Sequence, residues 1–171
     1  CVTGMVIIPA TGLAISLASD NPVAGTLPKG ATGVTFLKFN VSGSGTLSSL
    51  TFKRMGIGAT ADFATSGFYL FDGNTRLTTG RSLNSTSHEV SFTNLALAIS
   101  GVKTLTLVAD VASAATTGNV NSFELVGMTG DSTPTGTAKG NSMTIAGQAV
   151  GGITADNSAA PANPKIGQKE A

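Results

Sequence analysis

The sequence is poor in cysteine, charge and aromatic side chains, and each shortage excludes a class of protein. Its 171 residues include one cysteine, one histidine, one tyrosine and no tryptophan. The single cysteine, Cys1, allows no intrachain disulfide and no paired-cysteine metal or redox motif. Only 11% of the residues are charged and the formal net charge is +1, so the electrostatic basis for binding nucleic acid is missing.

Long hydrophobic runs are missing as well. The longest one, residues 5–10, is far shorter than the roughly 18 residues of a membrane-spanning helix, so no membrane insertion is expected. The first residue leaves two interpretations open: Cys1 is the lipid-bearing cysteine of a mature lipoprotein, or the sequence simply starts there. No signal-peptide pattern is present, so any such peptide is expected to have been removed.

Hydroxyl groups, glycine and alternating hydrophobicity are abundant instead. There are 41 serines and threonines and 22 glycines. Apolar and polar residues alternate in short runs, which turn signals separate about every eight to twelve residues. In the clearest run, 103–111, Leu105, Leu107, Ala109 and Val111 are expected in the core and the residues between them in water. The sequence therefore predicts an all-β fold, an antiparallel β-sandwich of immunoglobulin-like or jelly-roll-like type with about seven to ten strands.

The strand and core residues can be assigned from the same pattern. Asp72-Gly73-Asn74 predicts a tight hairpin, because glycine and asparagine tolerate positive φ. The expected strands are 13–18, 34–41, 47–55, 67–71, 75–79, 89–93, 95–99, 103–111, 122–126 and 142–146. The expected core residues are Phe36, Leu37, Phe39, Leu50, Phe52, Phe68, Leu70, Val90, Phe92, Leu105, Leu107, Phe123 and Leu125.

The two ends of the chain carry weakly similar segments, 12–31 and 152–171. Each runs from glycine through a strand-like stretch to a segment with proline and lysine. This similarity predicts an N-terminal extension at 1–11, a β-sandwich domain at 12–150, and at 151–171 the start of a following repeat or an inter-subunit tail. The alternative is a linker at 151–171 whose composition matches by chance.

Several runs together resemble a known repeated domain. They are 17–22 (LASDNP), 29–39 (KGATGVTFLKF), 50–54 (LTFKR) and 69–77 (YLFDGNTRL), continued by 94–95, 103–111 and 121–123. The resemblance is to a β-sandwich repeat of large secreted surface proteins from uncultivated small-genome bacteria, and it covers about residues 12–150. It implies tandem display at a cell surface, and it carries over no catalytic residue because the shared motifs are strands and turns.

Residues that could carry chemistry are few and scattered. His88 is the only histidine, which excludes a multi-histidine metal site, and without a GxSxG motif it is expected to be a solvated loop residue. The acidic residues are isolated, so calcium would need loops that converge in space. We therefore expect no enzyme activity and no cofactor. Asn40 and Asn84 fit the N-glycosylation sequon, and Lys38 and Asn121 are arbitrary candidates for an isopeptide link.

The apolar extension sets the functional prediction. As a free edge strand, residues 2–8 would be an aggregation hazard, so they are either the first strand of their own sheet or a donor strand for a neighbour. We predict an extracellular, cell-surface structural module, a filament subunit or a surface-layer repeat, whose partners are identical subunits or neighbouring repeats. Its expected contact residues are Val2, Val6, Ile7, Ile8, Ile153 and Ile166. The alternative is an adhesin or carbohydrate-binding module that takes surface glycans at Tyr69, Arg76 and Arg81.

Overall fold

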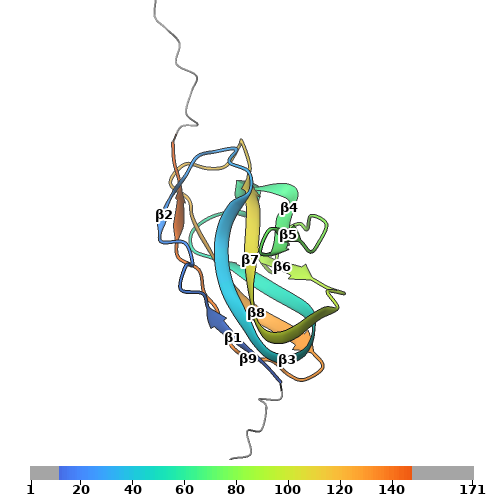
Figure 1. Cartoon of the computed structure of the whole chain (residues 1–171). Coiled ribbons are helices and arrows are strands. Elements are labelled where there is room, and N and C mark those ends of the chain that lie inside the picture. Colours follow the sequence, from blue (N-terminus) through green and yellow to red (C-terminus); the bar gives the residue numbers. More distant parts are fainter. Residues whose placement is uncertain (1–11, 148–171) are drawn as a thin grey trace, which may run out of the picture.

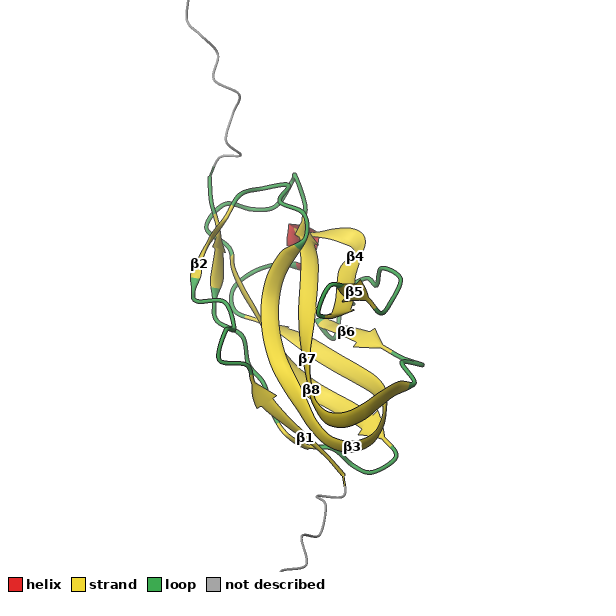
Figure 2. Ribbon diagram, viewed as in Figure 1, coloured by secondary structure: helices red, strands yellow, loops and turns green. Residues whose placement is uncertain are grey.

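A computed structural model describes residues 12–147 of the chain. Its regular structure is almost entirely strand, with one helical turn, η1 (Thr60–Asp62), before the fourth strand (Figure 2). The strands are β1 (Gly12–Leu17), β2 (Gly25–Leu27), β3 (Val34–Met55), β4 (Phe63–Asp72), β5 (Thr75–Arg76), β6 (Glu89–Phe92), β7 (Leu97–Val111), β8 (Val120–Gly130), β9 (Thr135–Gly136) and β10 (Met143–Ile145).

The 22-residue strand β3 belongs to two layers of sheet (Figure 1). Its first part pairs with β7 on one side and with β1 on the other, whereas from Leu47 onward it pairs with β8 and β6. The first layer therefore has the order β9-β1-β3-β7-β4-β5, and the second has the order β2-β10-β8-β3-β6. A strand that bends from one layer into the other forms a corner of the sandwich.

Glycines make the corner possible. Gly43 and Gly45, both on β3, have φ angles of +119° and +144°. Gly101 of β7, which pairs with Gly43, has a φ angle of +90°. A side chain at Gly43 would overlap the carbonyl oxygen of Gly12, so the close approach of β1 requires glycine as well. The glycines bend the strands here without reversing the chain.

Phenylalanine fills the space between the layers. The rings of Phe36 and Phe68, in the first layer, each lie 5.3 Å from the ring of Phe123 in the second, in edge-to-face contact. Phe39 and Phe52 make a further contact at 5.6 Å. Every residue predicted for the core is buried, and none is more than 4% exposed.

The predicted all-β sandwich is confirmed, with ten strands in the described part of the chain. The runs expected as separate strands at 34–41 and 47–55 are one strand, β3, and those at 95–99 and 103–111 are joined in β7. The sheet is antiparallel except at β2 and β9, two short strands that the sequence does not predict and that pair in parallel.

Two local expectations meet different outcomes. The hairpin is confirmed: Asp72 pairs with Thr75, and Gly73 has a φ of +57°, as the first loop residue of a type II′ turn requires. The water-facing side of 103–111 is only partly exposed, because Thr106 and Val108 are each 8% exposed. They lie opposite Phe71 and Tyr69 of β4, whose side chains border them.

The two ends of the described chain lie at opposite poles of the molecule. Figure 1 shows β1 beginning at the lower pole, while the chain leaves β10 at the upper pole beside β2. The corner formed by Gly43 and Gly101 lies near the start of β1, because Leu13 pairs with Gly43. The predicted extension at 1–11 and the segment at 151–171 lie outside the described residues.

Candidate functional site

One strand edge is open at the corner of the sandwich. β7 pairs with β3 along Leu97–Ala109, but β4 covers the other side of β7 only from Leu105 onward. Over residues 97–104, no strand of the described chain pairs with that side. Alternate residues of an edge strand direct their N–H and C=O groups outward. This edge therefore offers main-chain donors and acceptors to another strand.

The residues along this edge include two features that limit chance pairing. Val102 is 67% exposed, whereas Ile99 is buried in the core. Gly101 bends the edge, and the Lys103 ammonium at one end lies 2.6 Å from the Asp72 carboxylate. A bend and a lysine are features by which proteins protect open edges from chance partners. A strand that binds here has to follow the bend at Gly101.

A surface hollow of about 510 Å³ lies beside the open edge. It is lined by the start of β1, by Ser42 and Gly43 of β3, by Gly101 and Val102 of β7, and by the loop before β9. Gly12, the first described residue, is one of the lining residues. The hollow therefore extends from the start of β1 across β3 to β7.

The six predicted contact residues lie outside the described part of the chain. They are Val2, Val6, Ile7, Ile8, Ile153 and Ile166. The open edge itself is not predicted from the sequence, because Gly101 between two apolar runs is equally typical of a turn. Only the pairing of β4 with the second half of β7 shows that the first half has one neighbour.

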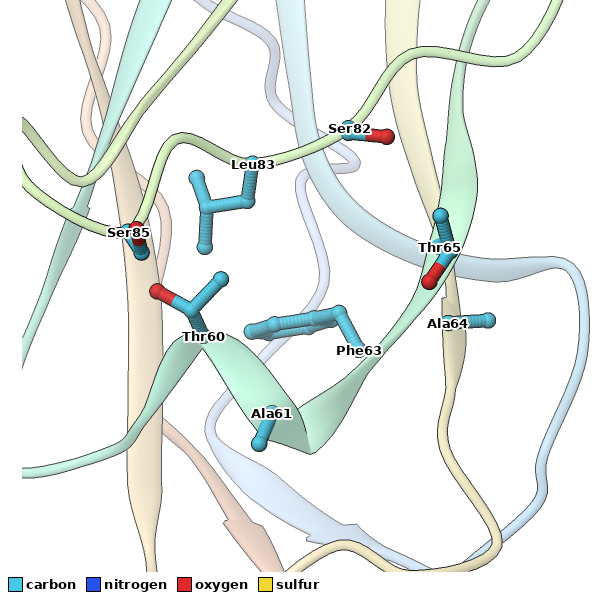
Figure 3. Close-up of a pocket in the computed structure, with 8 residues that line it drawn as sticks. All are labelled: Thr60, Ala61, Phe63, Ala64, Thr65, Ser82, Leu83 and Ser85. Carbon is cyan, nitrogen blue, oxygen red and sulfur yellow. The ribbon is translucent and has the colours of Figure 1, made fainter.

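A second hollow, of about 410 Å³, lies between η1, the start of β4 and residues 82–85 (Figure 3). Its floor is apolar, formed by Phe63 and Leu83, and hydroxyl groups surround it. The hydroxyls belong to Thr60, Thr65, Ser82 and Ser85. No charged side chain lines it, so its chemistry suits a small neutral molecule more than an ion.

The hairpin residues predicted for glycan binding form a different arrangement. The Arg76 guanidinium lies 4.0 Å from the centre of the Tyr69 ring and covers one face of it. Arg81 donates through Nη1 to the Thr79 hydroxyl at 2.7 Å. One face of the Tyr69 ring is therefore occupied by Arg76 and is closed to a sugar ring.

Asp62 is the centre of a buried hydrogen-bond network. Its carboxylate accepts hydrogen bonds from the main-chain N–H of Ala59 (2.9 Å) and Thr116 (3.0 Å) and from the side-chain amides of Asn119 and Asn121. Burial alone raises the pKa of Asp62, but these donors outweigh it and hold the pKa below its usual value. The network ties η1 to the β7–β8 connection and to β8, which is a structural role.

The remaining candidates are not brought together. His88 is half buried rather than solvated, and within residues 12–147 its ring makes no hydrogen bond to a hydroxyl or carboxylate. Lys38 pairs with Asp20, with 2.7 Å between Nζ and Oδ2, whereas Asn121 donates to Asp62. These two residues of the isopeptide hypothesis therefore have different partners. The Lys38 hydrogen bond lowers the pKa of Asp20.

The two sequon asparagines differ in accessibility. Asn84 is exposed, and its Oδ1 accepts hydrogen bonds from the N–H groups of Thr86 and Ser87 in a local turn. Asn40 lies within β3, half buried, and its Oδ1 accepts from the Thr104 hydroxyl. Asn84 is the more accessible of the two, and glycosylation of either stays a prediction.

Residues 12–147 contain neither a cluster of metal-ligating side chains nor a membrane-spanning helix. Between residues 12 and 147, no three His, Cys, Asp or Glu side chains stand close enough together to hold a metal ion. No helix in that range is long and apolar enough to cross a membrane.

Comparisons with known proteins reach only distant structures. No protein-family model matches the sequence, and no curated protein matches it. The chain is similar to the sixth cohesin of Acetivibrio cellulolyticus scaffoldin B, solved in complex with a Cel5 dockerin, at 11% identity and a TM-score of 0.29, over 78% of this chain and 97% of that one. A CaDoc0917–CaCohA2 complex is similar at 13% identity and a TM-score of 0.29, over 78% and 99%. These values are too low to transfer a partner or a function.

Proposed function

We propose that this chain is a structural module of an extracellular surface assembly, joined to identical units or neighbouring repeats through a strand edge. The observation that carries the proposal is the open side of β7 at residues 97–104. Proteins seldom leave an edge of this length uncovered, because it is a template for pairing with another chain. Addition of a strand to such an edge is a common mode of protein association.

The placement of the two ends of the described chain supports the same proposal. β1 begins at one pole and the chain leaves β10 at the opposite pole, which suits units connected in series, as in a filament or a tandem-repeat stalk or layer. The surface is rich in hydroxyls and poor in charge, and pairs such as Ser49–Thr129 and Thr51–Ser91 bond to each other across strands. The proposal assigns no reaction to the domain, and its setting follows the surface-protein resemblance of the sequence.

Assembly through the β7 edge is tested with a charge placed on it. We expect the full chain to form species larger than a monomer in light scattering. Val102→Lys should weaken this association by about 1 kcal/mol, roughly fivefold, because a lysine on an edge opposes strand pairing. The matched control is Val126→Lys, another exposed valine, on β8, which should leave association unchanged. A full chain that stays monomeric at every concentration would contradict the proposal.

Binding of a neutral glycan is a second candidate function, favoured by the hydroxyl-lined hollow of Figure 3. Sugars bind where hydroxyl partners surround an apolar floor, and Phe63 with Leu83 provides that floor. Calorimetric titration with a panel of neutral oligosaccharides should then give heat that is lost in Ser82→Trp, a variant that fills the hollow. No heat with any member of the panel would argue against this function.

A further inference from the structure

We propose that the open edge of β7 receives residues 2–8 of a second copy of the chain as an antiparallel strand, with Gly4 of the donor opposite Gly101. This inference rests on the proposed function and adds to it the identity and the register of the incoming strand. It combines the observed edge at residues 97–104 with the sequence of the N-terminal extension.

The extension has the composition that the edge needs. Residues 2–8 read Val-Thr-Gly-Met-Val-Ile-Ile, without charge or proline and with a majority of β-branched residues. Such residues favour extended structure, and the absence of proline leaves every N–H free to pair. The segment is about as long as the uncovered part of β7, so one strand can occupy the whole edge.

Glycine positions fix the register. At the corner, Gly101 on β7 lies opposite Gly43 on β3, and both have positive φ. A strand added beside Gly101 meets the same bend, and Gly4 is the one residue of the donor that accepts such a backbone without strain. Aligning Gly4 with Gly101 in an antiparallel pair places Ile8 opposite Leu97 and Val2 opposite Lys103, inside the open edge.

The same alignment excludes the parallel direction. With Gly4 opposite Gly101 in a parallel pair, Ile8 would lie opposite Leu105, where Asp72 of β4 already pairs with β7. In the antiparallel register, apolar donor residues also fall on the core side of the sheet and a polar one falls on the exposed side. Val6 and Ile8 lie opposite Ile99 and Leu97, on the face that Ile99 buries in the core, and Thr3 lies opposite the exposed Val102.

The donor has to come from another copy because the chain's own extension is too short. Gly12 lies opposite Ser44, which lies opposite Ser100, so Gly12 is separated from the donor position by three strand spacings. The donor position opposite Leu97 also lies three residues farther along β7 than Ser100. The straight distance from Gly12 to that position is therefore about 17 Å across the outer face of the sheet. The four links from residue 8 to residue 12 extend at most about 14 Å.

A disulfide between two differently labelled copies tests both the register and the origin of the donor. All variants carry Cys1→Ser. One copy carries Thr3→Cys and the other Val102→Cys, two outward positions that the proposed register places opposite each other, within disulfide range. Mixing the two under mild oxidation should give a covalent heterodimer. The control pair is Thr3→Cys with Ser100→Cys, two residues out of register and about 7–8 Å apart, which should lose that product.

Each result bears on a different part of the proposal. The heterodimer with the first pair and its loss with the second support the donor strand in this register. Equal crosslinking of both pairs would overturn the register. If a variant that lacks residues 2–8 still assembled, residues 2–8 would not be the donor strand, while the proposed function would stand. A disulfide that forms only within one copy carrying both Thr3→Cys and Val102→Cys would overturn the exchange between copies.

Discussion

Asp62 shows how one carboxylate can organise a region of a protein that has little charge. Its two oxygens accept hydrogen bonds from Ala59, Thr116, Asn119 and Asn121, and every one of these partners is a donor. A carboxylate suits this environment because it only accepts. An asparagine at the same position would direct its own NH₂ group at other donors and leave some of them unsatisfied.

Replacing Asp62 with asparagine should therefore destabilise the fold. We expect Asp62→Asn to lower the free energy of unfolding by about 3 kcal/mol, the cost of leaving buried donors without an acceptor. Urea unfolding followed by circular dichroism measures the change. The control is Asp20→Asn, which removes an exposed, water-screened ion pair with Lys38 and should change the stability far less. Equal losses in the two variants would contradict the role given to Asp62.

The pH dependence of stability follows from the lowered pKa of Asp62. The folded protein binds this proton less readily than the unfolded chain does, so protonation favours unfolding. The stabilisation is complete above the unfolded pKa of about 3.9 and disappears as the pH falls through the lower, folded value. Thermal unfolding measured from neutral pH down to about pH 2.5 should show this loss below about pH 4, and Asp62→Asn should show less of it.

Residue patterns predict the core well and the Asp62 network not at all. Phe52, Phe92 and Phe123 alternate with polar neighbours, and burial follows from that local pattern. Asp62 is an isolated acid in the sequence, and all its partners except Ala59 come from residues 116–121, on another part of the chain. Nothing local distinguishes it from an exposed aspartate, because its burial depends on tertiary contacts.

At the scale of elements, the corner in β3 depends on the absence of a side chain at Gly43. Gly43→Ala should destabilise the fold strongly, because its Cβ would overlap the Gly12 carbonyl oxygen in addition to straining a positive φ. Gly33→Ala is the matched control: it has a φ of +66° with open space around it, and should cost only about 1–2 kcal/mol. Thermal unfolding of both variants measures the difference. If the two were equally stable, the contact between β1 and β3 would not require glycine.

The same glycines explain why the strand boundaries were only partly predictable. Gly43 and Gly45 between two alternating runs are typical of a turn, and so is Gly101. In the structure the chain continues in the same strand through each of them. Whether glycine reverses or bends a strand depends on the neighbouring strands: β1 and β7 pair with β3 across this point and hold it extended.

At the scale of the whole molecule, the candidate site is a property of topology. The open edge exists because β7 continues past the end of β4, and no motif in the sequence marks that difference in length. Composition does predict the strand that would bind this edge, because residues 2–8 have the apolar, β-branched pattern of a strand without a partner. The extension can be matched to the edge only once the structure shows that residues 97–104 of β7 have no neighbour on one side.

The opposite placement of the start of β1 and the end of β10 also determines how the domain responds to tension. A force that pulls the start of β1 away from the opposite pole reaches the rest of the domain through the six residues of β1 that pair with β3 (Figure 1). Because antiparallel hydrogen bonds lie perpendicular to the strands, such a pull loads them all in shear at once instead of opening them one after another. The domain is thus built to resist stretching from its two poles.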